Sequence, residues 1–400
     1  MTIQEDLPFP QDAAQDGKQE SRALAAAHSR RNVFRTWDPP RERMSKMPWR
    51  IQSGLKQHVP DDLALFVEWF DEQPEARERF RWALRDSLDE LLDGQRTGRW
   101  AYQHLTKTEK TYLGTAVEVN LTKEFAIDNG ADLDWSIADS DIDCKFSKDL
   151  GGWEIPMEMY LCADHGEREG RANHAAVVTW MNDDTSEWAA GIVRITDARL
   201  RWKKERDANG DRVRAYNRDN KRKLSEGAKS EVYWLWGGLQ TDLPTNLLRH
   251  LDAQARERIL TASLPRRASS GQQRLNQLFR EVRDRIVGRQ TVLTVGQQDD
   301  SPKRARDARK HLRPEGIVVL GHQGSHPGVA RALGLPVPIK GEWISTRLVP
   351  VSSDDARPKF SLDGESWARA RGDEPMHPAP DLPDDREIDK PHCPEFGINS

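Results

Sequence analysis

The stretch Ala131-Asp-Leu-Asp-Trp-Ser-Ile137, followed after a short turn by Asp141-Ile-Asp-Cys-Lys-Phe-Ser147, decides how the rest of the chain is interpreted. Successive side chains of a β-strand point to opposite faces of the sheet. The apolar residues of both runs would therefore share one face, and the acidic residues and Lys145 would share the other. We expect two neighbouring strands that bury one face and gather several carboxylates and one lysine at a single edge.

The acidic face of these two strands indicates a particular chemistry. Carboxylates at close range raise one another's pKa unless a cation lies among them. Ligands that are all oxygen suit a hard cation such as magnesium. Lys145 follows Asp143 by two positions, so its ammonium group would lie where it can orient water or stabilise charge on a phosphate. The spacing fits metal-assisted phosphodiester cleavage. A solvated hairpin with ordinary surface acids is the alternative, and the pattern alone does not exclude it.

Two motifs stand at a fixed distance from each other in the first half of the chain. Asp134 is followed nine positions later by Asp143-Cys-Lys145, and Glu118 lies sixteen positions upstream of Asp134. The other motif is Leu91-Leu-Asp-Gly-Gln-Arg-Thr-Gly-Arg-Trp100. Together they resemble the NaeI-type restriction endonucleases of the PD-(D/E)XK nuclease class, over about residues 55 to 350.

In that family the second motif is similar to the nucleotidyl-lysine motif of DNA ligases, Lys-x-Asp-Gly. Here Leu91 takes the place of the ligase lysine, ahead of Asp93 and Gly94. Without the lysine there is no amine to form a covalent nucleotide adduct, so ligase or topoisomerase chemistry is not expected. Leu91 is expected to be a core residue.

The resemblance implies a type II endonuclease that cuts both strands of duplex DNA with Mg²⁺. Asp134, Asp143, the Cys144 carbonyl and Glu118 would form the metal site, and Lys145 would complete the catalytic set by positioning the attacking water. It also implies a homodimer that binds two copies of a palindrome, with a cognate DNA methyltransferase as a separate protein. The family's sequence is GCCGGC, cut bluntly at its centre. Asp141 has no assigned role.

Composition sets the limits within which these interpretations stand. A chain of 400 residues is long enough for two domains, and its mean hydropathy is −0.81. No apolar run approaches the roughly 20 residues that span a bilayer, and the amino terminus does not read as a secretory signal. Three cysteines give neither a disulfide framework nor a metal-ligand spacing. We expect a cytoplasmic protein with reduced thiols and no membrane partner.

The net charge of −4 conceals a strong asymmetry. Residues 51–200 hold 16 Lys and Arg against 30 Asp and Glu, whereas residues 201–350 hold 30 against 16. An acidic part that needs a metal and a basic part that can hold DNA are typical of a two-domain nuclease. Variation of charge for solubility alone is the alternative.

Periodicity and turn residues predict the elements. Helices are expected over 60–70, 74–92, 106–127, 243–260, 271–287 and 301–311, and strands over 131–137, 141–147, 153–161, 175–181, 188–195 and 316–320. The apolar stripe of 74–92, which includes Phe80, Trp82 and Leu88, is expected to be buried. Thr106 is a candidate cap for the helix that carries Glu118.

These elements suggest five segments. We expect a disordered leader over 1–50, a PD-(D/E)XK endonuclease domain over 51–205, a charged linker or hairpin over 206–229, a second domain over 230–350 and an acidic disordered tail over 351–400. The fold class is α/β, with a restriction-endonuclease-like mixed sheet flanked by helices. Arginines and lysines of 199–229 are candidates for phosphate contact.

The second domain is expected to be a winged helix-turn-helix (CAP-like) module that binds the additional copy of the site. Its basic helix over 301–311 precedes a buried strand, as in modules whose helix enters the major groove. The candidate DNA-binding residues are Lys303, Arg304, Arg306, Arg309 and Lys310. A solvated charged face is the alternative for this helix. Two other functions also fit the chain, namely a DNA-binding regulator that does not cut and a nuclease specific for branched or mismatched DNA.

Overall fold

The computed structural model describes residue 37 and residues 50–160, 174–262 and 271–382. Nearly all of the predicted leader, and the tail beyond 382, lie outside the described residues. The chain divides into two compact units. Of the described residues, 50–92 and 100–249 form the N-terminal unit, and residue 37, 93–99 and 250–382 form the C-terminal unit. Within this part of the chain no helix is long and apolar enough to cross a membrane.

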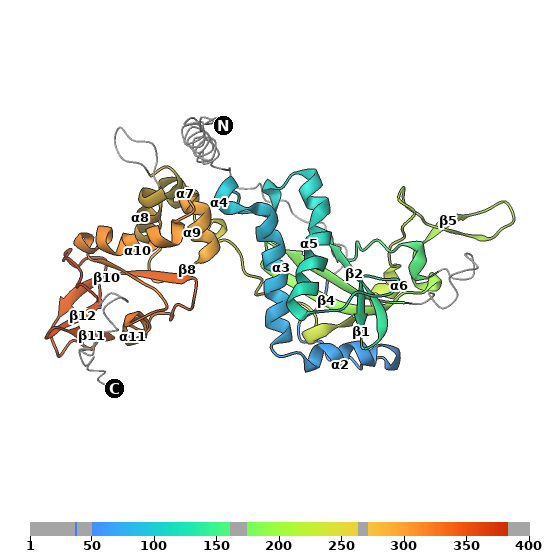
Figure 1. The fold of residues 1–400 in the computed structure, drawn as a ribbon, viewed down its shortest axis with the longest axis horizontal. Helices are drawn as coiled ribbons and strands as arrows, with labels where there is room; N and C mark the ends of the chain where they lie inside the picture. The colour runs from blue at the N-terminus through green and yellow to red at the C-terminus, as the bar shows by residue number, and fades with distance from the viewer. Residues whose placement is uncertain (1–36, 38–49, 161–173, 263–270, 383–400) are drawn as a thin grey trace, which may run out of the picture. The chain divides into compact units, whose positions relative to one another are not determined.

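A five-stranded mixed sheet is the centre of the N-terminal unit (Figure 1). Its strands in spatial order are β1 (Trp135–Ile137), β2 (Ser140–Ser147), β3 (Ala175–Asn182), β4 (Glu187–Arg194) and β7 (Tyr233–Trp234). Strands β2 and β3 are parallel, and the other neighbours are antiparallel. Every residue of β3 is buried, as expected for a strand covered on both faces.

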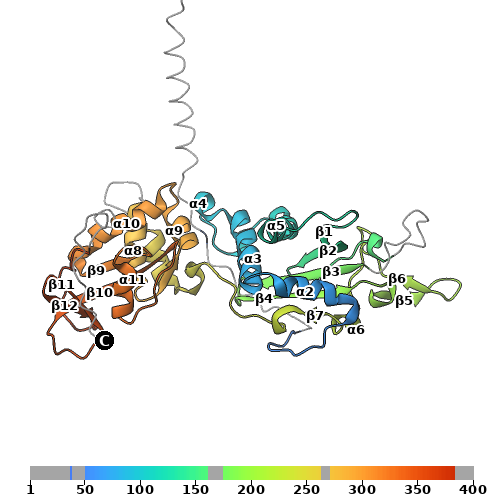
Figure 2. The same cartoon turned by 60° about the horizontal axis from the view of Figure 1, so that its bottom comes forward.

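Three helices cover one face of this sheet (Figure 2). They are α2 (Ala64–Glu72), α3 (Ala76–Leu92) and α5 (Lys107–Phe125), which agree with the helices predicted over 60–70, 74–92 and 106–127. Their apolar residues form one core with Ile142, Cys144 and Val177 of the sheet. The opposite face packs against a second core that includes Trp153, Ile155 and Trp180.

Short helices connect the larger elements of the N-terminal unit. Four of them are the 3-10 turns η1 (Asp61–Leu63), η2 (Tyr102–His104) and η6 (Leu235–Gly237), and the helix α6 (Glu226–Lys229). The turn η1 precedes α2, so the N-cap of α2 is Leu63 and no side chain caps it. By contrast, Thr106 caps α5 as predicted, in a capping box with Glu109.

Several predictions for this unit were wrong. The strand expected over 131–137 pairs only from Trp135 onward. The strand expected over 153–161 is instead an isolated bridge at Ile155 and a 3-10 turn, η3 (Met157–Met159), because the ring of Pro156 removes a ladder donor. Trp82 is 42% exposed rather than buried, and its indole donates to Glu78 on the surface of α3.

The charged segment after β4 forms part of the N-terminal unit. A turn η5 (Asp197–Arg199) leads into the antiparallel ribbon β5 (Trp202–Arg206) and β6 (Arg212–Arg214), so the segment takes the hairpin form. The second domain was expected to begin at residue 230, but β7 (Tyr233–Trp234) pairs with β4 of the N-terminal sheet. The division between the units therefore falls at residues 249 and 250.

The C-terminal unit combines a helical cluster with a second sheet (Figure 1). Its elements are α4 (Gly94–Thr97), α7 (Ala253–Leu260), α8 (Gly271–Glu281), β8 (Ile286–Gly288), α9 (Arg289–Gly296), α10 (Ser301–Leu312), η8 (Arg313–Glu315), β9 (Ile317–Leu320), α11 (His326–Ala332), β10 (Glu342–Val351), β11 (Lys359–Leu362) and β12 (Glu365–Arg369). The sheet has the order β11-β12-β10-β8, and β9 pairs with β10. Helix α10 and strand β9 agree with the predictions over 301–311 and 316–320.

Three predictions for the second half of the chain were wrong. The helix expected over 243–260 is a 3-10 turn, η7 (Leu247–His250), followed by α7, which Asp252 caps. The helix expected over 271–287 ends at Glu281, and Val287 lies in β8. The tail expected to be disordered from 351 instead forms the hairpin β11–β12, because the alternating Phe360, Leu362 and Trp367 are buried in the core of this unit.

Candidate active site

Asp134, Asp143 and Lys145 come together at the β1–β2 edge of the sheet. Trp135 pairs with Ile142, so Asp134 stands beside Asp143 on the neighbouring strand. The Cys144 N–H donates to Asp134 Oδ2 at 3.0 Å. Lys145 Nζ donates to Asp143 Oδ1 and lies 3.5 Å from Asp134 Oδ2 and 3.4 Å from the Cys144 carbonyl oxygen. One ammonium group therefore bridges two carboxylates and a backbone carbonyl.

The two carboxylates of this site have opposite protonation tendencies. Burial raises the pKa of Asp143 to about 8, and the hydrogen bond shared with Asp134 acts in the same direction. Burial opposes ionisation of Asp134 too, but its hydrogen bonds from Asp143 and Cys144 and the charge of Lys145 hold its pKa below the ordinary value. The pair tends to keep one proton between its members, which is the behaviour of two acids that compete for too little positive charge.

Glu118 reaches this site from helix α5. The helix packs over β2, and Trp135 Nε1 donates to Thr122 Oγ1 at 2.7 Å, which ties α5 to β1. Burial and the nearby Asp134 raise the pKa of Glu118, while Lys145 lowers it. In the described residues its carboxylate forms no hydrogen bond with the other members of the site. Glu118 is thus an electrostatic neighbour of the pair.

The donor set fits a hard divalent cation. Its atoms are carboxylate and carbonyl oxygens from Asp134, Asp143 and Cys144, and Mg²⁺ in proteins uses one or two carboxylates and takes its other ligands from water and phosphate. Across the described residues, no three side chains of His, Cys, Asp or Glu form a complete metal-binding cluster. Lys145 supplies the positive charge between the carboxylates in this structure.

Asp141 has a structural role that sequence reasoning did not assign. Its carboxylate accepts hydrogen bonds from the backbone N–H groups of Ala131 at 3.1 Å and Asp132 at 2.7 Å. A Cβ atom at Gly130 would lie 2.6 Å from the Leu133 carbonyl oxygen, so the turn requires glycine. This turn holds the chain out of the sheet until Trp135 and thereby sets the position of Asp134.

The ligase-like motif also has a structural role. Leu91 is half-buried against the core of the N-terminal unit, as expected. Asp93 has a positive φ of 46° and pairs with Arg96 at 2.6 Å. Residues 93–99 pack in the C-terminal unit, where a Cβ atom on Gly94 would lie 2.3 Å from Thr294 Oγ1. Gly94 of the motif therefore allows α4 to pack closely against the helix that carries Thr294.

The basic residues of α10 divide into two groups. Lys303, Arg306 and Lys310 are exposed. Arg304 pairs with Asp300 at 3.0 Å, and Arg309 Nε donates to the Val319 carbonyl at 3.0 Å. The candidate DNA-binding set thus contains three residues that face solvent and two that also brace the helix.

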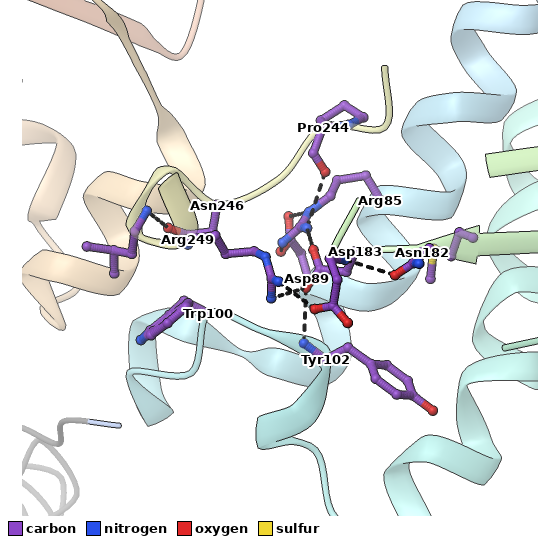
Figure 3. Close-up of polar contacts among 12 residues, drawn as sticks. Arg85, Asp89, Trp100, Tyr102, Asn182, Asp183, Pro244, Asn246 and Arg249 are labelled. Carbon is purple, nitrogen blue, oxygen red and sulfur yellow. Dashed lines mark hydrogen bonds and ion pairs between the residues drawn. The ribbon is translucent and has the colours of Figure 1, made fainter. Parts of the chain in front are cut away.

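Sequence reasoning missed a buried ion network in the N-terminal unit (Figure 3). Asp183, 1% exposed, pairs with Arg85 at 2.9 Å and with Arg249 at 3.2 Å. Its Oδ2 also accepts from the Tyr102 N–H at 3.1 Å. Arg85 in turn binds Asp89 on its own helix. The signal for this network was an arginine within the apolar stripe of α3, where a charge requires a buried partner.

A mixed sheet covered by helices, with Asp and Asp-x-Lys on adjacent strands, fits the restriction-endonuclease-like class of nucleases. Residues 67–378 match the family described as restriction endonuclease NaeI. The chain is also similar to the type II restriction enzyme NaeI of Lentzea aerocolonigenes, with 40% identity over 309 residues that cover 76% of this chain and 89% of the relative. This chain belongs to the NaeI family. It is a type II restriction endonuclease, a site-specific deoxyribonuclease that acts on double-stranded DNA.

Proposed function

We propose that the chain cuts duplex DNA with Mg²⁺ at the site formed by Asp134, Asp143 and Lys145. The observation that carries this proposal is the convergence of two carboxylates, the Cys144 carbonyl and one ammonium group at a single sheet edge. Asp134, Asp143 and the Cys144 carbonyl would hold the metal, with Glu118 completing or orienting its shell. When bound, Mg²⁺ would activate water and neutralise charge that develops on the phosphate.

The protein's own groups then position the reaction. The Lys145 ammonium would hold the attacking water and a phosphate oxygen. The attacking water gives up a proton to solvent as its oxygen forms a bond to phosphorus, in line with the breaking bond to the 3′ oxygen. The 3′ oxygen leaves with a proton from solvent, and a 5′ phosphate remains.

We also propose that the C-terminal unit is a winged helix-turn-helix module that binds a second copy of the site and activates cleavage. Its supporting feature is the order of elements α8, β8, α9, α10, β9 and β10, with β10 between β8 and β9 in the sheet. In such modules the last helix before the wing strands enters the major groove. That helix is α10, whose exposed face carries Lys303, Arg306 and Lys310.

By resemblance, the chain would work in the cytoplasm as a homodimer on a palindrome, since a two-fold protein suits a two-fold site. GCCGGC, cut bluntly, is the proposed sequence, and a separate methyltransferase would protect the host DNA.

The active-site proposal is tested with Asp143→Asn on a plasmid that carries many candidate sites. The wild type is expected to cut with Mg²⁺ and not with EDTA. The variant should bind the same DNA in a gel shift but lose at least about 100-fold in cleavage rate, because a metal ligand of the transition state is gone. Asp149→Asn, which removes an exposed carboxylate just after β2, is the matched control and should cut normally. Cleavage by Asp143→Asn at the control's rate would contradict the assignment.

A further inference from the structure

Where the β5–β6 ribbon joins the rest of the N-terminal unit, a region that we call its base, the arginines are paired with acidic side chains. Arg214 pairs with Asp197 at 3.2 Å, and the fully buried Arg222 binds the same carboxylate. Arg201 pairs with Glu226 at 2.8 Å. These arginines are part of the framework that holds the ribbon on the sheet.

A tryptophan at the base fixes the direction of the ribbon. The guanidinium carbons of Arg212 and Arg222 lie 4.2 Å and 4.8 Å from the centroid of the Trp202 ring. Trp202 also pairs across the ribbon with Arg214. Such cation–π contacts order both partners. In Figures 1 and 2, β5 and β6 reach outward from the rest of the N-terminal unit. The ribbon therefore projects from the unit and is held in place at its base by these contacts. We call it the arm.

The strands of the arm carry four cations besides Arg214, against one acid, Glu205. Lys203, Lys204, Arg206 and Arg212 are exposed, and in the described part of the chain none of them pairs with a carboxylate. Arg206 and Arg212 stand directly opposite each other on the two strands. Like charges in such a cross-strand pair are destabilising, so an anion between or beside them would stabilise the arm.

Two acids of the arm, Asp207 and Asp211, lie at its tip, and a third, Glu205, lies in β5 between Lys204 and Arg206. Asp207 Oδ1 accepts hydrogen bonds from the N–H groups of Asn209 at 2.9 Å and Asp211 at 2.8 Å, which closes the turn. Its carboxylate is thus engaged with the backbone of the turn. The two strands of the ribbon, and not its tip, are therefore the part that attracts an anion.

The distribution of these cations identifies the kind of anion. Lys203 and Lys204 are consecutive in β5 and so lie on opposite faces of the ribbon, with Glu205 on the face of Lys203. A ribbon with a lysine on each face fits between two lines of negative charge, and the major groove of duplex DNA admits a two-stranded ribbon between its phosphate backbones. A flat anionic surface would engage one face only.

We propose that the β5–β6 ribbon is a DNA-binding arm that enters a groove of the substrate duplex and contacts phosphates through Lys203, Lys204, Arg206 and Arg212. This inference deepens the proposed function and rests on it, because the duplex held by the arm is the one presented to Asp143 and Lys145. The arm adds affinity without reading bases, since phosphate contacts position a protein and carry no sequence information directly.

The test is the salt dependence of binding by the full chain to a duplex that contains one site, measured in EDTA so that no cleavage occurs. Each lost phosphate contact reduces the slope of log K against log salt by about 0.9. The double variant Lys203→Gln/Lys204→Gln should reduce the slope by about 1 to 2 and weaken binding roughly 10-fold near 0.1 M salt. Lys56→Gln/Lys123→Gln removes two exposed lysines from the same unit and should leave both quantities nearly unchanged.

Equal slopes for the arm variant and the control variant would overturn the proposal. Cleavage by the wild type with Mg²⁺ is measured in parallel, so that the two proposals can fail separately. If the wild type cuts but the slopes coincide, the arm is wrong and the active site stands. If the slopes differ but nothing is cut, the arm stands as a DNA contact and the proposed chemistry fails. Matching melting temperatures show that both variants are folded.

Discussion

Asp143 is the residue whose state depends most directly on its partners. Burial raises its pKa to about 8, compared with an ordinary value of 3.8. A folded-state pKa above the unfolded value means that the unfolded chain releases this proton first as pH rises. Without metal, the contribution of Asp143 to stability is therefore fully present below about pH 4 and is lost as pH approaches 8.

Asp143→Asn removes this dependence, because an amide stays neutral. In EDTA the variant and the wild type should be about equally stable near pH 4, and the variant should be more stable by several kcal/mol at pH 8. Urea denaturation at several pH values measures the difference. A difference in unfolding free energy that stays constant from pH 4 to 8 would contradict the shifted pKa.

Single residues also show which roles could be predicted from the sequence and which could not. Alternation in β2, with the resemblance, was enough to select Asp143 and Lys145, because a two-residue period needs only local sequence. The role of Asp141 was not predictable, since its partners are backbone N–H groups of a turn ten residues away. Asp183 was missed because its partners Arg85 and Arg249 are 98 and 66 positions distant.

Elements with strong local signals were predicted well. Thr106 and Glu109 define the start of α5, and the uniformly apolar runs define β3 and β4. Elements that depend on distant partners were not. The two-residue strand β7 exists only because β4 offers it an edge.

The ion network at Asp183 anchors several elements of the N-terminal unit at once: α3, the turn after β3, and the segments that hold Tyr102 and Arg249 (Figure 3). Asp183→Ala should lower the unfolding free energy by roughly 3 kcal/mol or more, because it leaves Arg85 buried without this partner. Asp184→Ala is the control, since the neighbouring Asp184 is 36% exposed in its pair with Arg249 and should cost about 1 kcal/mol or less. Equal losses in chemical denaturation would show that burial of the pair does not matter.

At the scale of the whole molecule, sequence predicted two domains and an acidic-to-basic charge division, but not where the chain divides. Residues 93–99 pack in the C-terminal unit, although they lie between α3 and α5 in sequence. The charged segment, expected as a linker or a hairpin, takes the hairpin form and is built into the N-terminal unit. Contacts this far apart in sequence leave no trace in local periodicity, so boundaries are harder to predict than elements.

The active site and the proposed DNA-binding helix α10 belong to different units. Activation by a second DNA site should therefore be separable from cleavage itself. Lys303→Gln/Lys310→Gln should reduce the rate advantage of a two-site plasmid over a one-site plasmid by about 10-fold, because each lysine is proposed to contact a phosphate of the second copy. The rate on the one-site plasmid should change little. Equal loss on both plasmids would instead place α10 on the cleaved copy of the site.

Sequencing of cleaved ends is the most direct test of whether this chain makes metal-dependent cuts at one DNA sequence. A plasmid with many hexamer sites is digested with Mg²⁺ and, in parallel, with EDTA. Discrete fragments are expected with Mg²⁺ only, and their ends should all carry the two halves of one palindrome and a 5′ phosphate. Ends scattered over unrelated sequences, or DNA that is shifted on a gel but never cut, would contradict metal-dependent cleavage at one sequence.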